Sequence, residues 1–150
     1  MPNSYVNLVY QLVFSTKKRR SWIDTSLADR LYSYLGAAIE GEGGHPVKIG
    51  GIEDHLHILA HFRQDTALSE SIKRIKSGST GWIHENFSNL RQFAWQEGYS
   101  AFTVSQSNVE TVSNYIARQK EHHRKRTFQE ELEQLLRFHG IQPDARFFDR

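Results

Sequence analysis

The segment from Gly50 to Phe62 places the strongest constraint on how this chain can fold. Its apolar residues alternate with a second series in which three of four positions are histidine: His55, His57, Leu59 and His61. A period of two is that of a β-strand, whose successive side chains point to opposite faces of a sheet. We therefore expect a strand with one face on a hydrophobic core and with His55 and His57 on the other face, roughly 7 Å apart.

Apolar periodicity elsewhere predicts the neighbours of this strand. It indicates strands over residues 6–14, 47–52 and 101–104, and helices over residues 27–39 and 68–87. Residues that favour helix N-caps precede both helices: Asp24, Thr25 or Ser26, and Asp65 or Thr66. The order strand–helix–strand–strand–helix–strand predicts an α+β fold of the ferredoxin-like or RRM-like kind, a four-stranded antiparallel sheet with both helices on one face.

Two further helices are expected after the last strand. Ser107 with Glu110, and Thr127 with Glu130, match the capping box that begins a helix. The first helix would run from Val109 to about His123 and lie across the bare sheet face, where the histidine pair projects. We expect one domain over residues 1–150, with a core of about 4–138 and a tail of 139–150.

Composition limits the possible chemistry. The 150 residues contain no cysteine, which excludes thiolate metal sites and cysteine nucleophiles. The formal net charge of +2 does not by itself identify a nucleic-acid-binding protein. No apolar run reaches the length of a membrane span and no signal-peptide pattern is present, so we expect a cytoplasmic, DNA-associated protein without membrane contact.

The predicted helix over the bare face supplies what a histidine pair lacks. Tyr115 and Gln119 are one turn apart, so their side chains emerge together. Gln119 can add an amide oxygen to His55 and His57, a donor set that suits Mg²⁺ or Mn²⁺. Tyr115 would then stand beside a phosphate held by that cation. Taken singly, the histidines also fit a half-exposed surface pair, Tyr115 a core residue and Gln119 a solvated one.

Two motifs resemble those of a known family. The stretch from Asp54 to His57 fits the His–apolar–His (HUH) motif of single-strand DNA nickases, and Asn114 to His123 is similar to the tyrosine helix of small single-tyrosine transposases. These are transposases of the insertion-sequence two-hundred type, including REP-associated tyrosine transposase relatives. Residues 12–17, 74–76 and 95–102 also resemble segments of that family, and the resemblance covers about residues 4–131.

The resemblance implies a function. Tyr115 would be the nucleophile, with His55, His57 and Gln119 as ligands of Mg²⁺ or Mn²⁺, in an HUH endonuclease fold. Members are homodimers in which the tyrosine lies beside the histidine pair of the other subunit. They bind hairpins in single-stranded DNA at element ends, and they cut and rejoin strands through a 5′-phosphotyrosine intermediate.

Basic residues form three clusters that we expect to contact DNA phosphates. Their members are Lys17, Lys18, Arg19 and Arg20; Lys73, Arg74 and Lys76; and Arg118 and Arg124. Asp54 and His122 are candidates for orienting the metal-binding or catalytic side chains.

Two alternatives stay open at this level. One is an RRM-like nucleic-acid-binding module without catalysis, although the paired aromatic motif that stacks bases is missing. The other is a domesticated relative that acts on palindromic repeats in the host genome.

Overall fold

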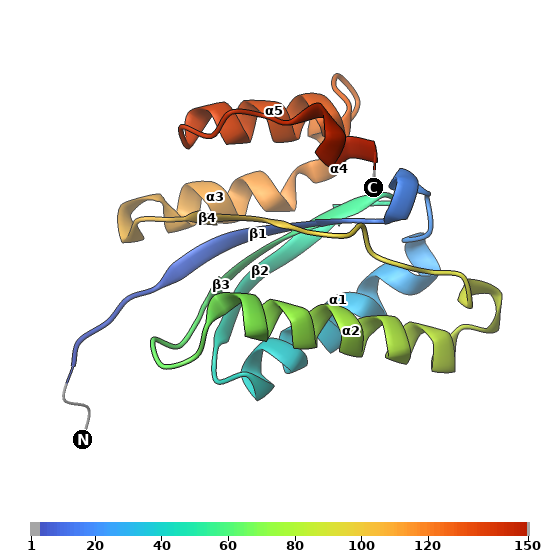
Figure 1. The fold of residues 1–150 in the computed structure, drawn as a ribbon, viewed down its shortest axis with the longest axis horizontal. Coiled ribbons are helices and arrows are strands. Elements are labelled where there is room, and N and C mark those ends of the chain that lie inside the picture. Colours follow the sequence, from blue (N-terminus) through green and yellow to red (C-terminus); the bar gives the residue numbers. More distant parts are fainter. Residues whose placement is uncertain (1–3, 150) are drawn as a thin grey trace.

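The computed structural model describes residues 4–149 and contains one antiparallel sheet of four strands (Figure 1). The strands are β1 (Val9–Ser15), β2 (His45–Ile52), β3 (His55–His61) and β4 (Ser100–Thr103), in the spatial order β2-β3-β1-β4. The two central strands pair in a register that sets Val13 opposite His57. This topology and its element order confirm the predicted ferredoxin-like arrangement.

One face of the sheet packs on two helices. These are α1 (Thr25–Gly41) and α2 (Leu68–Asn86), drawn below the sheet in Figure 1. The main hydrophobic core lies between these layers and includes Leu12 and Phe14 of β1 with Leu56 and Ile58 of β3. Alternate residues of the two central strands thus fill this core, which leaves the intervening residues, His55 and His57 among them, on the other face.

The second face is covered by the C-terminal helices. They are α3 (Val109–Ala117), α4 (Gln119–His122) and α5 (Phe128–Phe138), which Figure 1 shows above the sheet. Two smaller apolar clusters hold them there, one around Val9, Leu59 and Ile116 and the other around Val13 and Phe128. The single helix expected from Val109 to about His123 is therefore wrong, because the chain leaves helical geometry at Arg118 (φ −105°, ψ 24°).

The expected helix caps are partly confirmed. Asp24 accepts hydrogen bonds from the backbone N–H groups of Ser26 and Leu27, and Thr127 forms the full capping box with Glu130. The expected box at Ser107 is absent, because a 3₁₀ turn, η3 (Gln106–Asn108), occupies that position. The expected cap at Asp65 or Thr66 is also wrong. Helix α2 starts at Leu68, as expected, but its N-cap is Ala67, and the Asp65 carboxylate pairs with Arg63 instead.

Short 3₁₀ segments complete the chain. They are η1 (Lys17–Arg19), η2 (Ser88–Leu90) and η4 (Ala145–Asp149). Phe148 of η4 is buried in the second apolar cluster, and its carbonyl oxygen accepts a hydrogen bond of 2.8 Å from Arg19. The tail predicted over residues 139–150 therefore packs against the body as far as it is described. Among the described residues no helix is long and apolar enough to cross a membrane.

Gly50 allows α3 to lie directly on the sheet. A Cβ atom at this position would stand 2.8 Å from the carbonyl oxygen of Ile116, closer than real Cβ contacts. The sequence Gly50-Gly51 predicts a bulge or a tight hairpin; the structure has the tight hairpin, with Ile52 paired to His55, while the irregularity of β2 lies between Pro46 and Lys48. The glycine is needed for the close approach of a helix rather than for a bend in the strand.

We expect Gly50→Ala to destabilise the fold by about 1–3 kcal/mol, because the helix must move away from the strand. Urea unfolding would measure this change in the free energy of unfolding. Gly81→Ala is the matched control, because nothing lies within 4 Å of its added Cβ. An exposed helical glycine replaced by alanine should stabilise by about 0.5–1 kcal/mol. Equal effects of the two substitutions would contradict the packing argument.

Candidate active site

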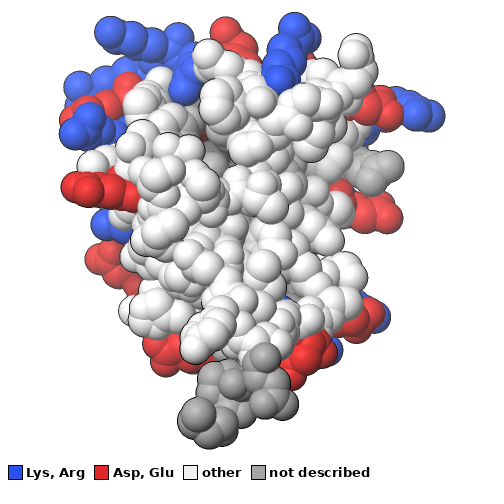
Figure 2. All heavy atoms as spheres, turned by 90° about the vertical axis from the view of Figure 1, so that its left-hand side faces the viewer, with Lys and Arg blue, Asp and Glu red and all other residues white. Residues whose placement is uncertain are grey.

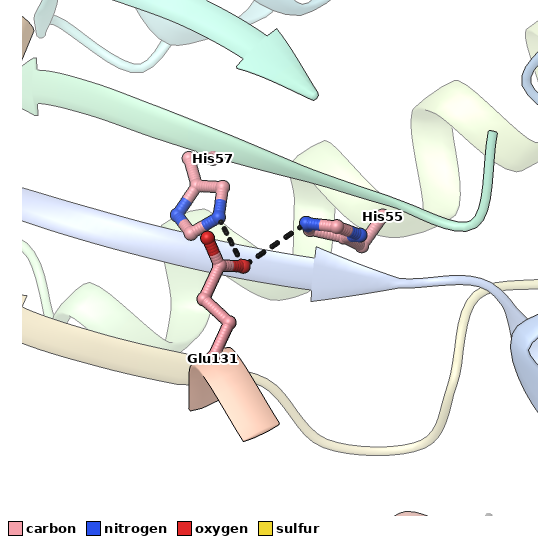
Figure 3. A group of neighbouring side chains, drawn as sticks. All are labelled: His55, His57 and Glu131. Atoms are coloured by element: carbon pink, nitrogen blue, oxygen red, sulfur yellow. Dashed lines mark hydrogen bonds and ion pairs between the residues drawn. The ribbon is translucent and has the colours of Figure 1, made fainter. Parts of the chain in front are cut away.

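Four polar side chains from three elements meet in the layer between β3 and the C-terminal helices. They are His55 and His57 of β3, Gln119 of α4 and Glu131 of α5, and each is at most 1% exposed. The Gln119 Oε1 atom lies 3.0 Å from His55 Nε2. One Glu131 oxygen, Oε1, lies 3.1 Å from His55 Nε2 and 3.0 Å from His57 Nε2 (Figure 3).

His55 is oriented by Asp54. The Asp54 carboxylate lies 2.7 Å from His55 Nδ1, which leaves Nε2 to face the cluster. Burial alone would lower the pKa of His55, but the hydrogen bonds to Asp54 and Glu131 outweigh burial and raise it to about 9. The expected orienting role of Asp54 thus has a contact to support it, since metal-binding imidazoles usually bond a carboxylate through their other nitrogen.

His57 has a different environment. Its Nδ1 atom lies 3.1 Å from the side-chain amide of Gln11, a buried residue of β1. Burial is the dominant influence and lowers the pKa of His57 despite the nearby Glu131 carboxylate. His57 is therefore neutral at physiological pH, which is the form that can bind a cation. Gln11 was not anticipated from the sequence as a contact of the site.

Glu131 is the main residue of the cluster that the sequence analysis missed. Burial would raise its pKa, but hydrogen bonds from His123, His55 and His57 lower it well below the usual range, so the carboxylate stays charged. A signal was present in the sequence. Glu131 falls within the apolar stripe of α5, next to Leu132 and three residues after Phe128, and an acidic residue in such a stripe needs buried partners.

Tyr115 lies at the edge of this cluster, in the same chain. Its hydroxyl donates a short hydrogen bond to Glu131 Oε2, and the Arg126 guanidinium lies 3.4 Å from the hydroxyl oxygen. Burial and the Glu131 carboxylate both raise the pKa of Tyr115, so the resting phenol is protonated. The ring of His122 stacks on Tyr115 at a centroid distance of 4.5 Å. His122 therefore contacts the tyrosine rather than the histidine pair.

The donor set fits a divalent cation. The facing ligand atoms of His55, His57 and Glu131 lie within 4.8 Å of one another, and the Gln119 amide oxygen adjoins them. Two imidazoles, an amide oxygen and a carboxylate are ligands that Mn²⁺ and Mg²⁺ accept, and no thiolate competes for softer metals.

Part of the expected basic surface lies beside this cluster. Lys18, Arg19 and Arg124 line a cavity of about 730 Å³ together with Asp54 and His123, which both contact site residues. Arg118 instead lines a second cavity of about 720 Å³, next to Gln119 and α1. On the face shown in Figure 2, charged residues are sparse in the middle. Lys and Arg gather towards the top of this view, which is the side of α5.

The remaining expected basic residues are not brought to the site. Lys17 and Arg20 are exposed at η1, and the Arg20 guanidinium lies over the Trp22 ring. Lys73, Arg74 and Lys76 belong to α2, on the opposite side of the sheet from the histidine pair.

Two of these α2 residues have structural partners. Arg74 pairs with Glu42 at 2.7 Å. The Lys76 ammonium group donates to the carbonyl oxygens of Gln96 and Gly98, and burial lowers the pKa of Lys76 to about 8. Lys76 therefore fastens the segment before β4 to α2.

Comparison with solved structures shows which proteins share this fold. A structure solved as that of a candidate transposase from Deinococcus radiodurans R1 superposes with a TM-score of 0.67, at 23% identity over 79% of this chain and 95% of that chain. A REP-associated tyrosine transposase bound to a REP hairpin gives a TM-score of 0.61, at 15% identity over 82% of this chain and 73% of that chain. The fold is thus the one that these two solved transposase structures share, as expected. Comparison with the curated proteins found no match.

The family follows from the sequence itself. The family model described as "Transposase IS200 like" matches residues 4–119, from the start of the described chain to Gln119. The chain belongs to this family of transposases, and the expected resemblance is confirmed. The match ends before α5, so Glu131 lies outside it.

The raised pKa of His55 predicts a pH-dependent stability in protein freed of divalent ions. Protonated His55 stabilises the fold fully below pH 6.5 and loses this contribution as the pH rises towards about 9. Asp54→Asn should lower the free energy of unfolding by roughly 1–3 kcal/mol at pH 6, because it removes a charged hydrogen-bond partner. The deficit should shrink between pH 6.5 and 9.

Chemical denaturation in EDTA across this pH range measures the effect. Asp29→Asn, an exposed change of the same kind on α1, should match the wild type at each pH. A deficit of Asp54→Asn that stays constant up to pH 9 would contradict the assignment of the charge to His55.

Proposed function

We propose that this transposase cuts and rejoins single-stranded DNA through a 5′-phosphotyrosine formed on Tyr115. The observation that carries the proposal is the position of the Tyr115 hydroxyl, which shares the Glu131 carboxylate with His55 and His57 inside one chain. A tyrosine packed in a core would not need a cluster of cation ligands beside its hydroxyl. Membership of a transposase family supports chemistry on DNA.

The proposed reaction conserves bonds and protons. The Tyr115 oxygen bonds to phosphorus while the bond from phosphorus to the 3′ oxygen breaks. The phenol loses its proton and the departing 3′ oxygen gains one, which leaves a free 3′-hydroxyl and a DNA end joined to Tyr115. A second 3′-hydroxyl then displaces the phenol and completes strand transfer. No ATP is needed, because the phosphotyrosine keeps the energy of the original phosphodiester.

His55, His57 and Gln119 would hold the Mg²⁺ or Mn²⁺ ion for this reaction. A bound cation supplies charge that offsets the developing negative charge on the phosphate oxygens. The Arg126 guanidinium, next to the Tyr115 hydroxyl, offers a second positive charge to the same phosphate. Asp54 and Gln11 fix the two imidazole rings through their Nδ1 atoms.

The arrangement argues against the RRM-like binding module. Such a module reads bases on an open sheet face with exposed aromatic residues. Here α3, α4 and α5 cover that face, and His55 and His57 are completely buried beneath them. Single strands are the proposed substrate because the phosphodiester must reach a hydroxyl at the edge of this covered layer.

A hairpin partner has a specific observation in its favour. One structural neighbour, a REP-associated tyrosine transposase, was solved bound to a REP hairpin. We propose that this chain likewise binds hairpin-bearing single strands. The second candidate function, action on palindromic repeats in the genome, rests on the same neighbour. Binding assays with hairpins from the flanking DNA and from repeated genomic palindromes would distinguish the two.

The proposal includes a homodimer, and the geometry bears on whether its two chains share their sites. The described chain supplies Tyr115, both histidines and Gln119 to one cluster. Chemistry in this arrangement needs no residue of a second copy. Sites shared between subunits, as the family resemblance implies, would require α3 to exchange between copies.

Replacing the nucleophile should abolish the covalent intermediate. With Mn²⁺ and single-stranded DNA from the flanks of its own gene, the wild type should give a protein–DNA adduct on a denaturing gel. Tyr115→Phe should lower adduct formation at least a thousandfold, because no oxygen remains to attack phosphorus, and should keep DNA binding. Tyr5→Phe, at a fully exposed tyrosine, should behave as the wild type. An adduct that persists in Tyr115→Phe would refute the proposal.

The salt dependence of DNA binding can distinguish basic residues that contact phosphates from those that do not. Arg124→Ala should weaken single-strand binding and reduce the slope of log K against log salt by roughly 0.7, the value for one lost phosphate contact. Arg74→Ala, an exposed arginine on the opposite side of the sheet, should leave both quantities unchanged. Fluorescence anisotropy at several salt concentrations measures both. Equal losses in the two variants would place the DNA elsewhere.

A further inference from the structure

We propose that Glu131 joins the cation to the nucleophile, with one carboxylate oxygen as a metal ligand and the other holding the Tyr115 hydroxyl. The proposal rests on the proposed function, since it adds a residue to that same site. It also reaches beyond the matched family region, which ends at Gln119.

The two oxygens of the carboxylate have different neighbours. Oε1 faces the two histidines of β3 at 3.0 and 3.1 Å, with His123 Nε2 3.2 Å away. Oε2 accepts hydrogen bonds from the Tyr115 hydroxyl and, at 3.0 Å, from the Gln119 amide nitrogen. One oxygen therefore points at the proposed cation ligands and the other at the nucleophile. Figure 3 shows the carboxylate reaching from α5 to both rings.

The charge of the site favours this role. His55, His57 and Gln119 are all neutral ligands when they bind a cation, and a neutral set holds Mg²⁺ or Mn²⁺ weakly. Glu131 adds a negative charge in a position with no solvent exposure. A fully buried carboxylate is costly unless cations or donors surround it, so its place among the ligands calls for a function.

The same contact fixes the tyrosine. Tyr115 belongs to α3 and Glu131 to α5, so the hydrogen bond between their side chains links the two helices. A hydrogen bond to an oxygen of a metal ligand keeps the phenol within reach of any phosphate on that metal. Glu131 is thus a positioning residue for Tyr115 as well as a ligand.

The test measures Mn²⁺ binding directly, by calorimetry and by the electron paramagnetic resonance of free Mn²⁺. Glu131→Gln keeps the shape of the side chain and removes its charge, and it should raise the Kd for Mn²⁺ at least tenfold. Glu133→Gln is the matched control on the same helix, where the carboxylate accepts a hydrogen bond from Gln129, and it should bind as the wild type. Tyr115→Phe should also bind as the wild type.

Activity provides the second readout. At saturating Mn²⁺, Glu131→Gln should still form the adduct at least tenfold more slowly than Glu133→Gln, because the phenol has lost its anionic partner. A wild-type Kd in folded Glu131→Gln would overturn the ligand role. A wild-type rate at saturating Mn²⁺ would overturn the positioning role.

Different variants test the metal site itself and the contribution of Glu131 to that site. His57→Ala should abolish Mn²⁺ binding whether or not Glu131 contributes, so normal binding in that variant would refute the metal site itself. Where circular dichroism shows that Glu131→Gln does not fold, the wild type is tested by ¹³C NMR. The Glu131 carboxyl resonance, assigned through its own side-chain carbons, should broaden first on adding Mn²⁺. A Glu131 signal that broadens no more than that of Glu133 would overturn the inference.

Discussion

A buried negative charge between two layers of protein is the interaction on which this structure depends. Glu131 comes from the last long helix, and the imidazoles that surround its carboxylate come from the central strand β3 and from the turn after α4. Desolvating a carboxylate costs several kcal/mol, and these imidazoles offset that cost together with the Tyr115 hydroxyl and the Gln119 amide. The position of α5 is therefore linked to the histidine pair, and the apolar contacts of Phe128 and Leu132 complete the attachment.

Much of the fold could be predicted because its signals are local. The period of two in β3 indicated which residues face the core. The starts of α1 and α5 followed from the capping residues Asp24 and Thr127. The same alternation placed His55 and His57 on the covered face. The spacing of Tyr115 and Gln119 then indicated that a phenol and an amide would arrive together, and both do lie at the cluster.

The rest could not be predicted because it depends on how distant segments dock. Glu131 is 74 residues from His57 in the chain, and no spacing rule joins a strand to a helix so far away. Nothing local to Gly50 shows why a side chain is excluded there, because the excluding atom belongs to Ile116 of α3. Lys76 reads as a phosphate contact, yet its ammonium group is engaged by two carbonyl oxygens on the other side of the sheet.

The separation between β3 and α5 has a consequence for the order of folding. All four strands are complete at Thr103, and the sheet with α1 and α2 has a core of its own. Contacts between residues close in sequence generally form sooner than those that close a long loop. The sheet with α1 and α2 can therefore fold while Tyr115 and Glu131 are still far from the histidine pair. A partly folded chain would then have the sheet that carries the histidine pair without the Glu131 carboxylate, which arrives with the last long helix.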